Sequence, residues 1–402
     1  MKRILFVDDD SKLLDGLRRS LRSLRNDFEM EFASSGPEAL EILLRKQFEI
    51  IVTDMRMPGM SGAALLAEVA NRHPQMIRII LSGTWDQDLR MQAVMTAHQY
   101  LSKPCDPETL RSTIGRAFAL RDVLLQPAIK ECVMRVGSLP SAPLVYQQFT
   151  QALRLPDISA REIGTIIAKD PAMTAKVLQL VNSAFFDICR RTANPVEAVV
   201  YLGMDAMRAL GQSVSVFSAF DGPQSTRSLI AALQEHCMSA AITAVAVARA
   251  MNTSQLMLDD AMVAGLLHDL GKLVLAVHFP SEYDRILATA SATEPEQLDA
   301  ERAVFGTTHA EIGGYLLWLW GLPDSIVEAV TFHHRPAQSS AQGFSAVAAV
   351  YAAEVLEWNA SSNGSSKGVP LGWDYFAALG LAEEFPQWAA ARQRLKDGEA
   401  CQ

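Results

Sequence analysis

The sequence lacks several features that would place it in a special class of protein. No run approaches the about 18 consecutive apolar residues that a membrane-spanning helix needs, and the first residues lead into a strand-like segment without the layout of a signal peptide. The five cysteines form no CxxC pair, so neither a zinc ribbon nor a disulfide framework is indicated. We therefore expect a cytoplasmic protein with reduced thiols and no contact with a membrane.

An excess of positive charge is also missing. Residues 1–125 hold 17 basic and 17 acidic side chains, and the rest of the chain holds 19 basic against 28 acidic ones, which accounts for the net charge of −9. A sequence-independent grip on a phosphate backbone needs clustered Lys and Arg. No basic recognition helix is visible either, so a transcription factor that binds DNA directly is not expected.

The chain has the length and composition of two or three globular domains. It has 402 residues, of which 49% are hydrophobic and 20% charged. Short apolar runs alternate with amphipathic segments over the first 120 residues, which favours a parallel α/β sandwich. Leu14, Leu17, Leu21 and Leu24 follow a polar start at helical spacing. We expect five strands, of which four can be placed: 4–7, 50–53, 78–81 and 99–101.

The remainder of the chain reads as helical. We place a helical linker at residues 123–137, an all-α domain at 138–340 and a C-terminal helical extension at 341–402. Apolar residues of this extension, among them Val347, Leu356 and Phe376, predict that it docks on the helical domain.

Charged and hydroxyl side chains gather at one edge of the predicted sheet. Asp8 and Asp9 follow the first strand and Asp54 ends the third, so three carboxylates meet where parallel sheets bind ligands. A hard cation such as Mg²⁺ would relieve their repulsion, and Asp54 is the candidate nucleophile for a phosphoryl group. Ser82 and Lys103 follow the next strands and can bind phosphoryl oxygens.

These residues lie in four motifs that resemble the receiver domain of response regulators: FVDDD, TDMRMPGMSG, LSG and YLSKP. The resemblance covers residues 1–122. It implies that Asp8, Asp9 and the backbone carbonyl of Arg56 bind Mg²⁺, that a histidine kinase phosphorylates Asp54, and that Ser82 and Lys103 sense the phosphate. Tyr100 would be the switch aromatic. A receiver that only packs and dimerises is the alternative.

The helical domain carries most of the histidines. His236, His268, His309 and the pair His333 and His334 fall in separate helical segments, and Asp269 follows His268 directly. Imidazole and carboxylate ligands suit Fe, Mn or Zn, and helix bundles assemble such sites from facing helices. Alternatively, His309 caps or packs its helix, while His268 and Asp269 order the bundle without metal.

Two long segments in this domain, GLLHDLGKLVL and THAEIGGYLLWLWGLPDSIVEAVTFHHRP, resemble the HDOD family, a relative of HD-type metal phosphohydrolases. SLPSAPLVYQQFTQAL and IIAKDPAMTAKVLQLVNSAFF extend the likeness toward residue 138. The resemblance implies metal-ligand positions for the five histidines and Asp269, with Lys272 placed to meet a substrate phosphate. Two departures matter: RPAQ replaces the acidic and GYP elements of cyclic di-GMP phosphodiesterases, and Glu354 stands for a late Asp.

Two functions follow as expectations. The first is a response regulator, expected as a homodimer, in which phosphorylation of Asp54 controls a non-catalytic HDOD output that contacts a downstream signalling protein. The second is a phosphorylation-gated metal phosphohydrolase, acting on a cyclic nucleotide through the histidines and Asp269.

Overall fold

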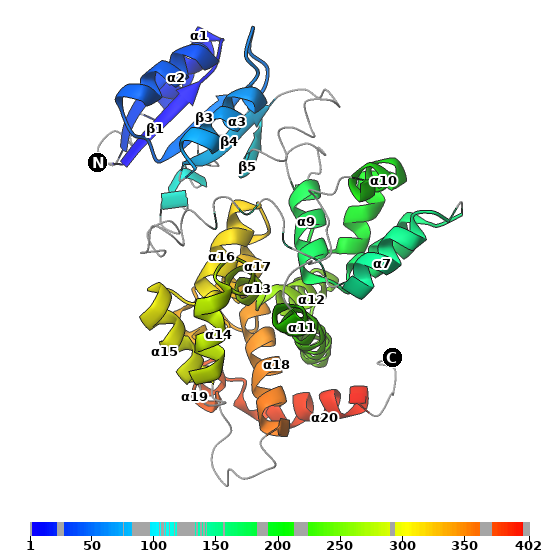
Figure 1. Cartoon of the computed structure of the whole chain (residues 1–402). Helices are drawn as coiled ribbons and strands as arrows, with labels where there is room; N and C mark the ends of the chain where they lie inside the picture. The colour runs from blue at the N-terminus through cyan, green and yellow to red at the C-terminus, as the bar shows by residue number, and fades with distance from the viewer. Residues whose placement is uncertain are drawn as a thin grey trace. The chain divides into compact units, whose positions relative to one another are not determined.

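The computed structural model describes residues 2–21, 28–74, 76–82, 97–103, 143–155, 157–182, 192–212, 224–289, 294–361 and 372–396, with single positions between 105 and 141. The chain divides into an α/β unit and a helical unit (Figure 1), and the main boundary along the sequence lies between Gly137 and Ser138. The linker expected at 123–137 lies almost wholly outside the described residues.

The α/β unit is built on a five-stranded parallel sheet in the order β2-β1-β3-β4-β5. All of β3 is buried, and β1 is buried from Ile4 onward, as a parallel sheet covered on both faces requires. This confirms the flavodoxin-like arrangement, in which a ligand site lies where the strand order reverses, between β1 and β3. The strands are β1 Lys2–Val7, β2 Phe28–Ala33, β3 Ile50–Asp54, β4 Ile77–Ser82 and β5 Gln99–Ser102.

Three helices of this unit begin at side-chain caps. The Asp10 side chain accepts a hydrogen bond from the Lys12 N–H at the start of α1 (Ser11–Ser20). The Ser35 side chain accepts one from the Glu38 N–H at the start of α2 (Gly36–Arg45). Ser61 caps α3 (Gly62–Arg72) through the Ala64 N–H. In the predicted leucine stripe, Leu14 and Leu21 are buried and Leu17 is half-buried, while Leu24 lies outside the described residues.

Gly62 lets α3 begin directly against the end of β3. Its N–H donates to the Met55 carbonyl at 2.9 Å, and a Cβ at this position would lie 2.0 Å from the Asp54 carbonyl oxygen. The backbone of Asp54 cannot retreat without breaking the end of a fully buried strand. A glycine is therefore required for the close approach that fixes the strand end carrying Asp54.

Gly62→Ala is expected to destabilise the α/β unit by about 1–3 kcal/mol, because the added methyl overpacks this contact. Gly16 in α1 is the matched control, since nothing lies within 4 Å of its Cβ position. Gly16→Ala should leave stability unchanged or raise it by about 0.5–1 kcal/mol. Urea unfolding of the two variants measures both effects, and equal stabilities would contradict this account of Gly62.

The described residues of the second unit form helices, which confirms the expected all-α fold (Figure 1). Helix α11 is central and packs against α12, α13, α18 and α20, while α12, α17 and α18 pack against one another. The helices are α7 Pro143–Ala152, α8 Ala160–Ile167, α9 Pro171–Asn182, α10 Pro195–Gln212, α11 Gln224–Ala250, α12 Gln255–Leu267, α13 Leu270–His278, α14 Pro280–Thr289, α15 Glu294–Phe305, α16 His309–Leu319, α17 Asp324–Phe332, α18 Ala346–Ser361, α19 Trp373–Ala378 and α20 Phe385–Lys396.

Two helical stretches, Thr226–Ala250 and Gln255–His278, have the length and mean hydropathy of a membrane span. Charged and polar residues interrupt both stretches, so a search for consecutive apolar residues does not detect them. In the second stretch 78% of the apolar window is buried inside the helical unit, and in the first 44%. Both are consistent with core helices of a bundle, of which α11 and α12 are the most closely packed pair.

The C-terminal extension docks on the bundle as predicted. Phe376 of α19 and Trp388 of α20 are fully buried in a cluster with Val247 of α11 and with Ala352 and Leu356 of α18. Helix α20 thereby packs against both α11 and α18. The extension is thus part of the support for two helices that carry polar side chains into the core.

Candidate functional site

The edge of the α/β sheet brings two carboxylates and an ammonium together. Asp8 follows β1, Asp54 ends β3 and Lys103 follows β5. Lys103 Nζ lies 2.6 Å from Asp8 Oδ2 and also contacts Asp54 Oδ1. Both carboxylates are buried, with Asp8 3% and Asp54 8% exposed. Three of the residues predicted for this site therefore meet, at the switch point of the sheet.

Charge explains how these groups share a small space. Burial raises the pKa of Asp8, and the hydrogen bonds from Lys103 and the Asp10 N–H offset only part of that rise. Burial would lower the pKa of Lys103, but its hydrogen bonds to Asp54 and Asp8 raise it. The Lys103 ammonium thus stays charged between two carboxylates. Its positive charge offsets their mutual repulsion.

The other residues predicted for this site take no described part in the contact between Lys103 and the two carboxylates. Asp9 is exposed beside Asp8, and the Arg56 N–H donates to Asp54 Oδ2 at 2.6 Å. Ser82 is the last residue of β4 and Tyr100 lies in β5, but their side chains lie outside the described residues. The oxygen-rich donor set of Asp8, Asp9 and Asp54 fits Mg²⁺, which prefers carboxylate ligands.

In the helical unit, six helices bring five histidines and two acids to one point. His236 lies on α11 and Glu354 on α18. His268 is the C-cap of α12, Asp269 precedes α13, and His309 is the first residue of α16. His333 and His334 follow α17. The structure therefore unites all six residues predicted as metal ligands, with Glu354 beside them.

A close backbone contact lets two of these helices meet. A Cβ on Gly271 would lie 1.9 Å from the carbonyl oxygen of His309, so only glycine allows α13 and α16 to begin so near each other. As a result His309 Nε2 lies 3.2 Å from Asp269 Oδ1.

The ligand atoms divide into two groups, which we call position one and position two. Position one consists of His236, His268 and Glu354. The Nε2 atoms of the two histidines are 3.1 Å apart, and each lies within 3.5 Å of Glu354 Oε1. Asp269 Oδ2 faces the same group, 3.6 Å from His236 and 3.5 Å from His268.

Position two consists of His309, His333, His334 and Asp269. His309 Nε2 lies 2.9 Å from His334 Nε2, and Asp269 Oδ1 is 3.2 Å from His309 and 3.8 Å from His333. Asp269 thus directs one oxygen at each position. A carboxylate so placed could supply one oxygen to each position.

Hydrogen bonds at the outer nitrogens aim the imidazoles inward. His268 Nδ1 pairs with the Gly265 carbonyl and His333 Nδ1 with the Val330 carbonyl, each at 2.7 Å. A carbonyl only accepts, so Nδ1 carries a proton, and in the neutral imidazole Nε2 presents a lone pair. Three buried atoms that face the cluster have no hydrogen-bond partner: His333 Nε2, Asp269 Oδ1 and Glu354 Oε1.

Lys272 lies one turn after Asp269 and donates to Asp269 Oδ2 at 2.7 Å. Burial would raise the pKa of Asp269, but Lys272 and His268 hold it well below its usual range. The ammonium therefore lies beside the cluster, and its contact with a substrate phosphate stays a prediction. Its described contact is with a candidate metal ligand.

Protonation differs among the histidines. Burial would lower the pKa of His268, but Asp269 and Glu354 raise it to about 9, and Glu301 and Asp269 raise that of His309 to about 9. Burial and the neighbouring imidazoles instead hold the pKa values of His333 and His334 well below the usual range. Without metal, His268 and His309 are thus cationic at neutral pH, whereas His333 and His334 are neutral.

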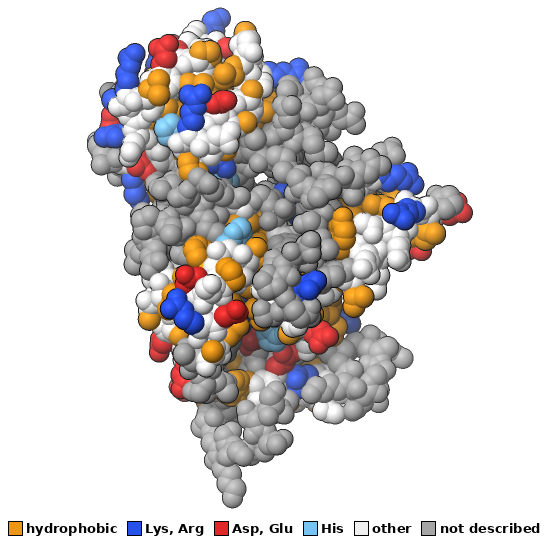
Figure 2. Space-filling view, viewed as in Figure 1, with side chains coloured by type: hydrophobic (Ala, Val, Ile, Leu, Met, Phe, Trp, Pro, Cys, Tyr) orange, Lys and Arg blue, Asp and Glu red, His pale blue; other side chains and the backbone are white. Residues whose placement is uncertain are grey.

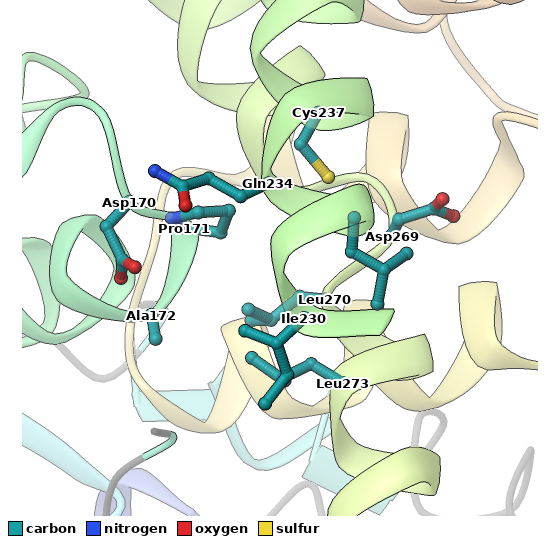
Figure 3. Close-up of a pocket in the computed structure, with 10 residues that line it drawn as sticks. Asp170, Pro171, Ala172, Ile230, Gln234, Cys237, Asp269, Leu270 and Leu273 are labelled. Carbon is teal, nitrogen blue, oxygen red and sulfur yellow. The ribbon is translucent and has the colours of Figure 1, made fainter. Parts of the chain in front are cut away.

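A pocket adjoins the cluster on the other side of Asp269. It is lined by Asp170 and Gln234 and by aliphatic side chains such as Ile230, Leu270 and Leu273. Figure 3 shows the Asp269 carboxylate turned away from these aliphatic side chains. The carboxylate therefore faces the histidines rather than the pocket.

Sequence reasoning missed two acids that contact the ligand histidines. Glu301 on α15 contacts His309, and Glu357 on α18 contacts His236. Glu301 precedes His309 by eight residues with a helix end between them, and Glu357 lies far along the chain from His236. No local spacing signals either pairing.

Comparison with known families matches both units. The family model described as "Response regulator receiver domain" matches residues 4–115, and the one described as "HDOD domain" matches residues 139–336. Receiver domains of response regulators generally use Mg²⁺, and such proteins are generally soluble and take their phosphoryl group from a donor such as a histidine kinase.

Individual relatives cover parts of the chain. A Treponema pallidum protein described as "Uncharacterized protein" is 28% identical over 229 residues, which is 56% of this chain and 44% of that protein. The hydrogenase transcriptional regulatory protein HoxA of Cupriavidus necator is 38% identical over 116 residues, 28% of this chain and 23% of HoxA. The chain thus spans less than half the length of these two relatives.

Among solved structures, the MmoQ response regulator from Methylococcus capsulatus is similar with a TM-score of 0.46 at 23% identity. The match covers 63% of this chain and 98% of that one. The two family matches, together with the geometry of the sheet edge, show that the chain belongs to the two-component response regulators and joins a receiver domain to an HDOD domain.

Proposed function

We propose that a histidine kinase phosphorylates Asp54 and that this event controls the HDOD domain. The contact of Lys103 with both Asp8 and Asp54 supports the proposal, because it places a cation where phosphoryl charge would arrive. An Asp54 oxygen would attack the phosphorus of the phosphohistidine. The O–P bond forms, the N–P bond breaks, and the leaving imidazole nitrogen keeps the electron pair.

The residues around Asp54 have distinct tasks in this transfer. Asp8, Asp9, Asp54 and the Arg56 carbonyl would hold Mg²⁺, which supplies charge neutralisation at the phosphoryl oxygens when bound. Because Lys103 also binds Asp8, it can leave Asp54 for a phosphoryl oxygen without losing its anchor. Ser82 and Tyr100 would complete the response, as the hydroxyl partner of the phosphate and the switch aromatic.

The proposed HDOD output includes two bound metal ions, one at each position. The observation that carries this is the convergence of inward-facing Nε2 atoms on both oxygens of Asp269, with the buried His333 Nε2 left without a hydrogen-bond partner. Such groups are costly to bury unless something binds them. Imidazole and carboxylate together suit Fe, Mn or Zn.

Metal binding is expected to strengthen with pH up to about pH 9. His268 and His309, each with a pKa of about 9, must lose a proton before they can bind metal. Below pH 9 each displaced proton should weaken the apparent affinity about tenfold per pH unit. Zn²⁺ titration calorimetry at several pH values, in buffers of different ionisation enthalpy, measures affinity and proton release. An affinity that does not change with pH would contradict the assignment of these ligands.

The output itself is proposed to be a contact with a downstream signalling protein, made by a homodimer whose HDOD surface changes on phosphorylation. Size-exclusion chromatography with light scattering, with and without a small phosphodonor, tests the coupling. An Asp54→Ala protein that still responds to the donor would rule this output out.

Metal-dependent phosphohydrolysis is the second candidate, favoured by the cluster of histidines and acids and by Lys272 beside it. The His236 side chain is 33% exposed, whereas His268 and His309 are buried, so a substrate would approach position one. Bound ions would supply Lewis-acid activation of a phosphoester. A cyclic-nucleotide screen tests this, with activity expected to disappear in both His268→Ala and Asp269→Ala. Activity that survives both changes would belong to another site.

Direct DNA binding is not part of the proposal, and we place the protein in the cytoplasm. On the face shown in Figure 2, basic and acidic side chains of the described residues are interspersed over the helical unit. The acidic balance beyond residue 125 points the same way. Tight sequence-specific binding in a low-salt gel shift would overturn this part.

A further inference from the structure

Glu301 is a buried acid whose described partners include one ligand histidine. It is fully buried on α15, and its Oε2 accepts the His309 backbone N–H at 2.8 Å and lies 2.7 Å from His309 Nδ1. Oε1 lies 3.0 Å from the same Nδ1 and accepts from Gln297 at 3.2 Å. Both oxygens thus hold the outer edge of an imidazole whose inner nitrogen faces Asp269.

Glu357 makes a looser version of this contact at position one. Its Oε2 lies 3.3 Å from His236 Nδ1, and Oε1 accepts from Ser239. The Glu357 side chain is 16% exposed, whereas that of Glu301 is not exposed at all. Each metal position therefore has one histidine backed by a carboxylate, while His268 and His333 are backed by backbone carbonyls.

We propose that Glu301 is the positioning residue of position two and that Glu357 is its weaker counterpart at position one. The inference rests on the proposed pair of metal ions. A carboxylate that accepts the Nδ1 proton fixes the tautomer with a free Nε2 lone pair and makes the imidazole a stronger donor to a metal. The shorter and drier contact of Glu301 gives it the larger effect.

Capping α16 does not explain why this residue is an acid. A glutamine could accept the His309 backbone N–H equally well, without the cost of burying a carboxylate. A glutamine amide can also donate to Nδ1, which would move the proton of His309 to Nε2 and block metal binding. A carboxylate can only accept, so it excludes that tautomer.

The experiment measures Zn²⁺ affinity in the full-length chain with one position removed. In a His236→Ala background, which leaves position two, Glu301→Gln should weaken Zn²⁺ binding about 10–100-fold. Glu357→Gln is the matched control and should change this affinity less than twofold. In a His334→Ala background, which leaves position one, Glu357→Gln should weaken binding by a smaller factor and Glu301→Gln should have no effect.

The outcomes separate this inference from the function on which it rests. Unchanged affinity of position two in Glu301→Gln overturns the inference alone, whereas a wild-type chain that binds no Zn²⁺ overturns the proposed metal pair as well. If Glu301→Gln does not fold, ¹⁵N-histidine NMR of the Zn²⁺-loaded wild type replaces it. A protected proton on His309 Nδ1 is expected there, and a metal bound through Nδ1 would refute the assignment.

Discussion

Asp54→Asn is expected to abolish phosphorylation of the chain. Asparagine keeps the shape of the side chain and can still accept the Arg56 N–H, but its amide lacks the anionic oxygen that attacks phosphorus. Intact-protein mass spectrometry after incubation with a small phosphodonor and Mg²⁺ measures the effect. The wild type should gain one phosphoryl group and the variant none.

Asp15→Asn is the matched control, because Asp15 is an exposed acid on α1 that pairs only with Arg18 among its described contacts. It should be phosphorylated as the wild type is. A phosphoryl group on Asp54→Asn, or loss of phosphorylation in Asp15→Asn, would show that another residue is the acceptor.

The receiver site could be predicted because its geometry follows from strand order. Once β1, β3 and β5 are recognised as parallel strands of one sheet, the residues at their carboxyl ends must share an edge, and Asp8, Asp54 and Lys103 do so. The sequence pattern does not place strand β2. It is an edge strand, half-buried except at Ala33, and its Glu29 and Glu31 pair with Arg3 and Lys46, so it lacks an apolar run.

The helical site could be predicted only in part. Four of its candidate ligand histidines lie within segments that resemble the HDOD family, and the structure brings them together with His236. Their partition into two positions depends on how α11, α16, α17 and α18 pack, and no periodic pattern in the sequence specifies that packing. The same holds for Glu301 and Glu357, which contact their histidines from other helices. An isolated acid on an amphipathic helix ordinarily signals an exposed face.

Changes at Asp269 and His268 are expected to have the largest effects on metal content. Asp269 faces both positions, so Asp269→Ala should lower the content from two ions per chain to none. His268 belongs to position one alone, so His268→Ala should leave one ion. Elemental mass spectrometry of anaerobically purified protein measures each, and circular dichroism checks that the helices remain.

His278→Ala is the control for these two variants. His278 ends α13, the helix that Asp269 precedes, and burial lowers the pKa of its imidazole with no acid of the cluster as a cause. Two ions should therefore remain in this variant. Equal metal content in all four proteins would mean that the ions bind elsewhere, whereas loss of both ions in His268→Ala would mean that position two fills only after position one. That second result would indicate that Asp269 couples the two positions, because the occupancy of position one would then set the affinity of position two.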